Sequence, residues 1–526
     1  MEVTNPRSWT QLPAEIWWKI LSDLIQAAEQ DGSSLAPYAT VSWEWQAAVE
    51  AVNFRSLNFT LALMAAIGFE KMAHRAWSLG LVRRVCIFVP LPQYGCPDCE
   101  VLPRIGSTGE VQRMKAAAQR TLCTAFWILA SWKRGGDLLL DITMQSASDA
   151  DHYFKHMDVG RPRRTTATTP PLVHDPRHGW ENGQRVSLPP GDAILRLFNR
   201  AEIYHGDLPR VTAVTRLVLR RQTTRRWDLI NLEDLVFECV NLKEFHFEPW
   251  RGWTIMGTYI INKGKSSVRQ LYFHTSCLSI DQSRLATRNF FGGLHRSAKQ
   301  LTTLVLFEDF SDAYIAAVSN PPLTSRGMAA GGVRRPCRKV SRALARSGGK
   351  LRNLEHLSAA FLIDATHFLP EMCLSPPNAW ASLASLTITS RRLAPEESTA
   401  VNDVFAEAAR AAAARLPALQ LLELWNARAG LASVLRYRAP AVVDARAAAR
   451  ASILWRATWN VELERRVIEM WERVACRGRP CELRVVIDYL DPARVKSHGD
   501  AIPLLGFDHD VVEPVSLEQI QRENRH

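Results

Sequence analysis

The chain has 526 residues and a formal net charge of +12; 47% of its residues are hydrophobic and 22% are charged. This composition is typical of globular proteins and excludes a largely disordered chain, and the length predicts more than one domain or one extended repeat array. Residues 1–11 do not resemble an export signal and no apolar run approaches the roughly 20 residues that cross a bilayer, so we expect reduced cysteines in the cytoplasm or nucleus and no membrane partner.

The first predicted element is an amphipathic helix that follows Pro13. Ile16, Ile20 and Leu24 recur every four residues, and Leu21 widens this apolar stripe. A helix of this length is marginally stable alone. We therefore expect its apolar face to pack on another surface.

This stretch resembles the opening of the F-box family in the run Leu12-Pro13-x-Glu15-Ile16-x-x-x-Ile20-Leu21-x-x-Leu24. The resemblance implies that residues 10–60 form an F-box-like, all-α module that docks on the SKP-type adaptor, and through it on the cullin, of an SCF ubiquitin ligase. The residues that the resemblance implies for adaptor binding are Leu12, Pro13, Ile16, Ile20, Leu21, Leu24, Leu35, Val41 and Trp45.

Two local features modify this resemblance. Residues Gln26–Ser34 lengthen the predicted turn after the first helix, and Pro37 falls in the first turn of the next helix, where proline is tolerated. A different interpretation of residues 12–57 is a helical cap that seals the rest of the fold. In that case the tryptophans of this stretch are core residues; they are Trp17, Trp18, Trp43 and Trp45.

Most of the remaining chain repeats a short strand pattern, apolar-x-x-apolar-x-apolar, with room for a helix between successive copies. Single units of this kind cannot bury their apolar faces, so we predict a degenerate leucine-rich-repeat-like β/α solenoid over residues 80–490 and an α/β fold class. The pattern occurs at Val214/Leu217/Leu219, Leu242/Phe245/Phe247, Val268/Leu271/Phe273, Leu301/Leu304/Leu306, Leu354/Leu357/Ala359, Leu383/Leu386/Ile388 and Leu419/Leu422/Leu424.

Further elements are predicted on both sides of these copies. We expect strands at 82–89, 137–144, 450–459 and 482–488, and helices at 110–133, 396–416 and 461–475. The proline- and arginine-rich residues 160–192 predict a loop, residues 320–350 a basic insertion, and residues 507–526 a turn-rich C-terminal tail.

The basic insertion holds much of the excess positive charge. Residues 326–352 contain nine Lys and Arg side chains and no acidic residue. One interpretation is a glycine-rich loop followed by a solvated helix with Val340, Ala343 and Leu344 on its inner side; another is a nuclear address or a patch for an acidic partner at residues 334–339. The segment lacks interleaved aromatic residues, which argues against nucleic-acid binding by base stacking.

The longer chain also resembles a group of filamentous-fungal F-box-like proteins of unassigned function. This resemblance says little about the partner. It is carried by Leu81–Arg84 with Leu91–Tyr94, by 208–215 through Arg225-Arg226-Trp227, by Phe247-Glu248-Pro249-Trp250 and by 304–310.

Catalytic and metal-binding patterns are incomplete in the sequence. Gly264-Lys265-Ser266 lacks the first glycine of a phosphate-binding loop, because Tyr259 stands there. Cys96-Pro97-Asp98-Cys99 is half of a zinc site, and Cys476 with Cys481 could offer the other pair. Without a nearby Cys or His partner we expect a turn with buried thiols instead, and His152 with His156 indicates an ordinary helix end. We therefore expect no enzyme, no catalytic residue, no cofactor and no metal.

These observations predict a substrate-recruiting F-box subunit whose solenoid binds an unidentified protein target. Trp250, Arg251 and Trp253 are candidate target contacts, since Trp and Arg dominate interface energetics; packing between turns of the solenoid is the alternative. A second function class is a non-ligase scaffold or nuclear interaction protein in which the N-terminal helices only cap the solenoid. A third is a nucleic-acid binder acting through Arg334 to Arg352, which would lose affinity steeply with salt.

Overall fold

The structure is a computed structural model of the whole chain. It describes residues 13–31, 33–61, 63–64, 80–101, 109–132, 137–157, 173–198, 200–201, 208–227, 229–251, 280–311, 314, 337–440, 449–477 and 481–523.

One twelve-stranded sheet dominates the described residues, and its strands follow one another in chain order. Every pair of neighbours is parallel except those that involve β14, which is antiparallel to both of its neighbours. The strands are β1 (Ser56–Phe59), β2 (Arg84–Leu91), β3 (Leu138–Ser146), β7 (Val214–Leu219), β9 (Glu244–Phe247), β10 (Thr303–Phe307), β11 (His356–Ala360), β12 (Ser385–Thr389), β13 (Leu421–Arg428), β14 (Leu431–Arg438), β15 (Ala449–Ala457) and β16 (Cys481–Tyr489).

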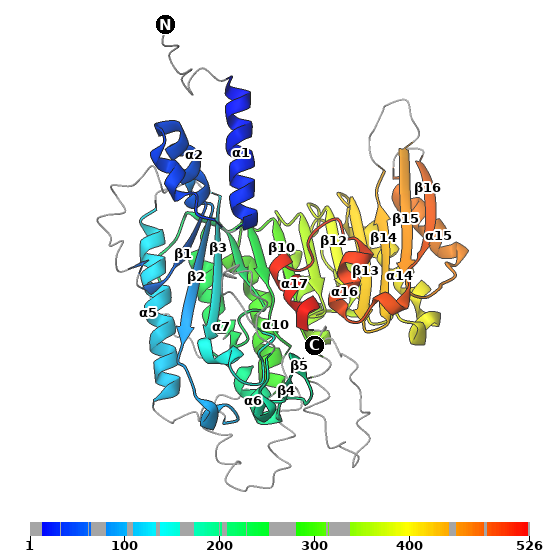
Figure 1. Ribbon diagram of the computed structural model, residues 1–526. Helices are drawn as coiled ribbons and strands as arrows, with labels where there is room; N and C mark the ends of the chain where they lie inside the picture. The colour runs from blue at the N-terminus through cyan, green and yellow to red at the C-terminus, as the bar shows by residue number, and fades with distance from the viewer. Residues whose placement is uncertain are drawn as a thin grey trace.

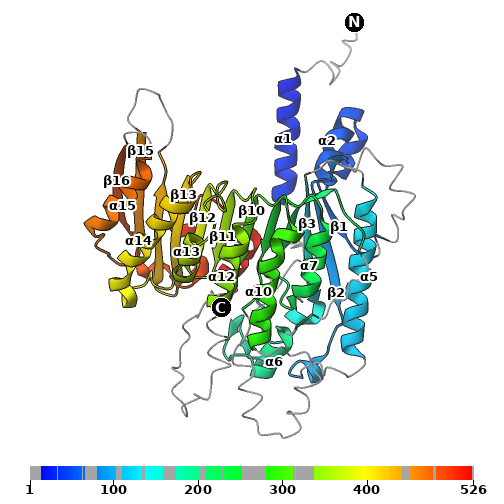
Figure 2. The same cartoon turned by 180° about the vertical axis from the view of Figure 1, so that it is seen from behind.

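A row of helices covers one face of this sheet, and Figure 2 shows that face. Each helix packs beside the helices of the neighbouring units, from α7 and α10 through to α14 and α15. Parallel neighbouring strands require such a crossover helix, because the chain must return to the end of the sheet at which the strands start before the next strand begins. The helices of this row are α5 (Glu110–Ala130), α7 (Leu229–Glu238), α10 (Ile280–Ser297), α12 (Arg338–Gly348), α13 (Ala365–Cys373), α14 (Ser398–Arg415) and α15 (Arg465–Ala475).

The main hydrophobic core lies between these helices and the sheet. Leu304 and Leu306 of β10 point into it, as do Leu344 of α12 and Phe405 of α14. β12 is buried along its whole length, and β10 and β11 are buried at every residue but the first. Strands with both faces covered are typical of parallel sheets in α/β proteins.

The opposite face of the sheet is covered in part by the end of the chain, which lies in front of the sheet in Figure 1. There α16 (His498–Leu505) and α17 (Pro514–Glu523) enclose a second apolar core that includes Trp425 and Ile520. The expectation of a turn-rich tail over residues 507–526 is therefore wrong. Ser516 and Ile520 recur on one face of α17 and are buried against the sheet, which folds the segment into a helix.

The repeated strand pattern is confirmed wherever the structure describes it. The copies that begin at 214, 242, 301, 354, 383 and 419 coincide with β7, β9, β10, β11, β12 and β13. The copy at 268–273 lies outside the described residues, and β9 pairs directly with β10. The strands expected at 82–89, 137–144, 450–459 and 482–488 are confirmed as β2, β3, β15 and β16, and the three expected helices as α5, α14 and α15.

Two expected boundaries are corrected. The sheet begins at β1, since Ser56–Phe59 pairs with Arg84–Ile87, and not near residue 80. The described part of residues 160–192 is not a plain loop. It contains the short helix η5 (Pro176–His178), the hairpin of β4 (Trp180–Glu181) and β5 (Gln184–Arg185), and the start of α6 (Gly191–Leu197). Trp180 is buried there and holds this segment against the body of the fold.

The α/β class is thus confirmed: the fold is a large, mostly parallel sheet flanked by helices. Two further strands, β6 (Arg200–Ala201) and β8 (Arg226–Trp227), form a separate parallel pair. Among the helices that the structure describes, none is long and apolar enough to span a bilayer.

Candidate functional site

The N-terminal helices lie beyond the edge at which the parallel strands begin, as Figures 1 and 2 show. They are α1 (Ala14–Asp31), the short helix η2 (Ala36–Thr40) and α2 (Trp43–Asn53). Ser42 caps α2, because its side chain accepts a hydrogen bond from the Trp45 backbone N–H. We call residues 13–54 the N-terminal module.

The inner side of the module is a small apolar core. Leu21 and Trp45 are buried together, while Ala28, Leu35 and Val49 form an adjoining cluster. Leu21 and Ala28 are seven residues apart, so they lie on one face of α1. This face holds the module together.

The predicted adaptor-binding residues divide into two groups. Leu21, Leu35 and Trp45 belong to the inner core, and Leu24 packs against it, so these four side chains mainly stabilise the module. Pro13 is exposed and its carbonyl accepts the first backbone hydrogen bonds of α1, from Ile16 and Trp17. Leu12 lies outside the described residues.

The outer side of the module exposes large apolar side chains. Ile16 is 47% exposed and Ile20 is 38% exposed, and their spacing of four residues places them side by side along α1. Neighbouring exposed apolar side chains of this kind are more common at interaction surfaces than on the rest of a soluble protein. We call the exposed apolar residues of the module the outer surface: Ile16, Trp18, Ile20, Tyr38, Val41 and Trp43.

The predicted lengthening of the turn after the first helix is wrong. Residues Gln26–Asp31 continue α1 instead, and the connection to η2 is short. Alanines in this stretch favour helix, and burial of Ala28 against Leu35 and Val49 supports the additional turn. Pro37 stands in the first turn of η2, as expected.

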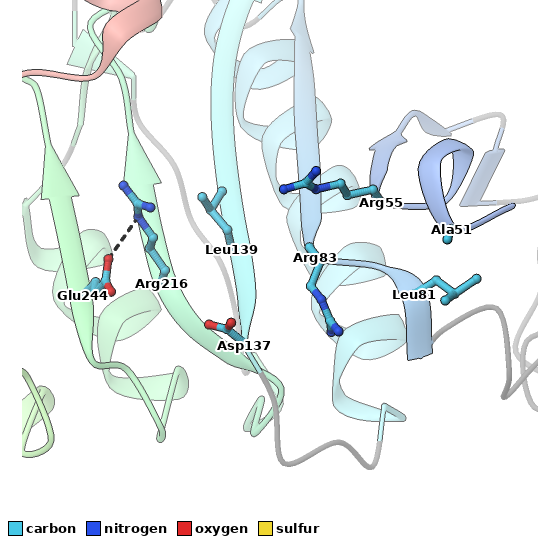
Figure 3. A pocket seen from close by; sticks show the side chains of 8 residues that line it. All are labelled: Ala51, Arg55, Leu81, Arg83, Asp137, Leu139, Arg216 and Glu244. Carbon is cyan, nitrogen blue, oxygen red and sulfur yellow. Dashed lines mark ion pairs between the residues drawn. The ribbon is translucent and has the colours of Figure 1, made fainter. Parts of the chain in front are cut away.

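A pocket of about 540 Å³ opens beside α2, where β2, β3, β7 and β9 begin (Figure 3). The pocket is lined by both positively and negatively charged side chains. The guanidinium of Arg216 points toward the carboxylate of Glu244, with Nε 3.2 Å from Oε2. The pocket therefore places a mixed-charge surface next to the N-terminal module. It is lined by Ala51, Arg55, Leu81, Arg83, Asp137, Leu139, Arg216 and Glu244.

Two cysteines and two histidines lie close together at the other end of the strands, just beyond the carboxyl ends of β2 and β3. Cys96, Cys99, His152 and His178 each offer one ligand atom, and all four atoms lie within 4.8 Å of one another. Cys99 and His178 are buried, and Cys96 and His152 are half-buried. We call these four residues the Cys-His cluster.

Local structure explains how each segment presents its residue. Cys96 begins a tight 3-10 turn in which the Cys99 N–H donates to the Cys96 carbonyl, so that both thiols reach one side. Ser146 and Asp149 form a capping box that starts the turns leading to His152. The turn that carries His178 ends at Gly179, whose φ of +74° suits glycine.

Burial and neighbouring polar groups change the pKa values of Asp175 and Cys99 at the cluster. The Asp175 carboxylate lies 2.7 Å from His178 Nδ1 and 2.8 Å from Lys155 Nζ. Burial opposes its ionisation, but these two partners together hold the pKa of Asp175 at about 2. Burial, reinforced by the neighbouring Cys96, raises the pKa of Cys99 to about 11.

The expectation that no Cys or His stands near Cys96 and Cys99 is wrong. The residues that complete the group are His152 and His178; His178 stands in no pattern of the sequence that indicates a metal ligand. Cys476 and Cys481 contact each other elsewhere, at the end of α15 and the start of β16. His156 does not act with His152 either, because its Nε2 lies 2.8 Å from the Tyr314 hydroxyl.

Trp250, the first of the candidate target contacts, does not lie on the surface. Trp250 is buried; its indole N–H donates to the Arg221 carbonyl at 2.6 Å, and the Arg221 guanidinium lies over its ring. The side chain therefore packs inside the fold. Arg251 is half-buried, and Trp253 lies outside the described residues.

The described part of the basic insertion is a helix, α12, with Val340 and Leu344 buried. Arg342 and Arg346 both face the Glu371 carboxylate, at 3.5 and 2.6 Å. These contacts agree with the interpretation of a solvated helix with an apolar inner side. Residues 326–336, which include the first half of the candidate nuclear address, lie outside the described residues.

Comparison with known proteins finds a relationship for only part of the chain. Residues 295–513 match a family described as a family of unknown function, DUF6546. This segment runs from the end of α10 to the residue before α17 and excludes both the N-terminal module and the Cys-His cluster. No curated protein and no solved structure matches the chain.

Proposed function

We propose that this chain is a non-catalytic, substrate-recruiting subunit of an SCF-type ubiquitin ligase in the cytoplasm or nucleus. The N-terminal module binds the SKP-type adaptor, and through it the cullin. The large sheet and its helices act as a leucine-rich-repeat-like solenoid that binds a protein target.

The observation that carries this proposal is the outer surface of the N-terminal module. Ile16 and Ile20 belong to the F-box-like run and are exposed at helical spacing, while the neighbouring inner stripe folds the module. Full burial of a fully exposed Ile is worth about 1.5–3 kcal/mol, so burial of the exposed half of Ile16 or Ile20 contributes roughly 1 kcal/mol each. In one common mode of protein recognition, an amphipathic helix places its exposed apolar stripe into a hydrophobic groove of the partner.

The repeat interpretation rests on chain order within the sheet. From β7 to β13 successive parallel strands are direct neighbours, and each return connection described there is helical. Stacked strand–helix units extend in one direction and present a broad surface suited to protein recognition. The module and this surface are joined directly, since α2 and β1 are separated only by Phe54 and Arg55.

The adaptor interaction is tested with the double variant Ile16→Asp, Ile20→Asp in the full chain. Both positions are exposed, so the variant should fold, whereas two carboxylates buried in an interface cost several kcal/mol. We expect a loss of at least about a hundredfold in affinity for purified SKP-type adaptor, measured by calorimetry.

The matched control is Ser22→Asp, Gln26→Asp, which adds the same charges at the same spacing on another exposed side of α1. It should bind the adaptor like the wild-type chain. Equal affinity of the Ile16/Ile20 variant and the wild-type chain would contradict the proposal.

The alternative is a scaffold in which the module only caps the sheet. It is favoured by one observation: the Arg55 carbonyl accepts hydrogen bonds from the N–H groups of Arg83 and Arg84, so the module leads directly into the edge of the sheet. This alternative requires that the wild-type chain does not bind the adaptor and that a chain beginning at Arg55 unfolds at a lower temperature.

A further inference from the structure

The Cys-His cluster has the composition of a structural zinc site. We propose that Cys96, Cys99, His152 and His178 bind one Zn²⁺ ion with tetrahedral geometry. The proposal is independent of adaptor binding, because the cluster and the N-terminal module lie at opposite edges of the sheet.

The distances within the cluster suit tetrahedral coordination. Zinc binds thiolate sulfur at about 2.3 Å and imidazole nitrogen at about 2.0–2.1 Å, so the ligand atoms of one ion stand roughly 3.3–3.8 Å apart. His178 Nε2 lies 3.2 Å from Cys96 Sγ and 3.8 Å from Cys99 Sγ. Small side-chain movements bring the whole set, which lies within 4.8 Å, to that spacing.

Each imidazole has one ring nitrogen free for the ion. His178 Nδ1 faces the Asp175 carboxylate at 2.7 Å, which turns Nε2 toward the thiols. Carboxylate–histidine–zinc arrangements of this kind are common, because the carboxylate fixes the ring and its tautomer. His152 Nε2 is buried and has no hydrogen-bond partner within the described part of the chain. A metal ion would satisfy this nitrogen.

The surroundings fit a closed, structural site. Cys99 belongs to an apolar cluster with Tyr153, Phe154 and Met157, and the Tyr153 ring packs edge-on against His178 with ring centres 4.9 Å apart. Four protein ligands leave no position open for a substrate, unlike catalytic zinc, which keeps one for water. Two thiolates also neutralise the charge of the ion, so the half-buried site gains no net charge.

The ion would join three segments that lie outside the strands of the large sheet. The Cys96–Cys99 turn follows β2, His152 follows β3, and His178 belongs to the segment before β4. Cys96 and His178 are 82 residues apart in the chain. Since the folded state alone brings the four ligands together, the free energy of zinc binding adds to the stability of this edge of the fold.

The first test is the zinc content of the full chain, produced in zinc-supplemented medium and measured by elemental mass spectrometry. We expect one zinc per chain, and loss of at least about nine-tenths of it in Cys96→Ser. The matched control is Cys476→Ser, which removes another half-buried thiol and should retain stoichiometric zinc. Absence of zinc from the wild-type chain, or full zinc content in Cys96→Ser, would overturn the proposal.

Two further measurements keep the test decisive if Cys96→Ser misfolds. Cobalt added to the metal-stripped wild-type chain should give the intense visible bands of a tetrahedral site and a thiolate charge-transfer band; the weak spectrum of octahedral cobalt would contradict it. Asp175→Asn, which keeps all four ligands, should weaken zinc binding roughly 10–100-fold in competition with a chelator. Unchanged affinity would contradict the carboxylate–histidine–zinc arrangement proposed for Asp175 and His178.

Discussion

At the scale of single residues, buried charges join the last helix to the sheet. The Arg221 guanidinium contacts Asp309 and lies 2.7 Å from Glu523 of α17, and His498 Nε2 lies 3.0 Å from Asp309. Glu248 accepts hydrogen bonds from the Ser516 hydroxyl and from the Glu513 backbone N–H. Removal of one partner from such a network leaves a buried charge unpaired, which is strongly destabilising.

Glu248 makes stability depend on pH. Burial raises its pKa to about 8 although its hydrogen bonds act in the opposite direction, so between about pH 4.5 and pH 8 the folded chain binds a proton that the unfolded chain releases. The stabilisation from this proton is complete below pH 4.5 and is lost as the pH rises through 8.

Urea unfolding of the wild-type chain and of Glu248→Gln at about pH 5 and about pH 8 tests this. Between about pH 5 and about pH 8 the wild-type chain should lose stability relative to the variant by on the order of 3 kcal/mol, because the glutamine side chain does not titrate. A difference between the two proteins that stays constant with pH would show that Glu248 is ionised in the folded state throughout.

At the scale of elements, the helix row is set by close contacts between neighbouring units. Gly348 at the end of α12 faces the Trp380 ring, and a methyl group there would stand 2.3 Å from a ring atom. Trp380 is itself buried and packs on Phe368 of α13. The glycine therefore permits this approach between α12 and the chain before β12.

Gly348→Ala should destabilise the fold by about 1–3 kcal/mol, since the buried indole has little room to move. Gly292→Ala in α10 is the matched control: its methyl group would meet no atom of the described residues within 4 Å, so it should be neutral or stabilise by up to about 1 kcal/mol through helix propensity. Thermal unfolding measures both. Equal effects would rule out the close contact with Trp380.

At the scale of the whole molecule, two cores on opposite faces share one sheet. The larger core spans the helix row, and the smaller core depends on α16 and α17, which come last in the chain. Within α17, Ile520 is buried whereas Glu518 is exposed. The end of the chain is thus part of the folded body.

Ile520→Ala should lower the free energy of unfolding by about 2–4 kcal/mol, because it opens a cavity beneath α17. The exposed neighbour Glu518→Ala removes only a surface ion pair with Arg522 and should change stability by less than about 1 kcal/mol. Chemical denaturation compares the two variants. If they were equally stable, α17 would not contribute to the core.

The sequence by itself determined most strands of the large sheet and the helices α5, α14 and α15, because their apolar periodicity is local: Leu386 and Ile388 of β12, for example, lie two residues apart. It also indicated the N-terminal helix, but not which of its apolar residues face outward. That division depends on packing, since Leu21 is buried with Trp45 of α2 while Ile16 is left 47% exposed. Only the tertiary structure decided that the last helix covers the sheet and that His178 joins Cys96. Both depend on contacts between distant segments, which local periodicity does not encode.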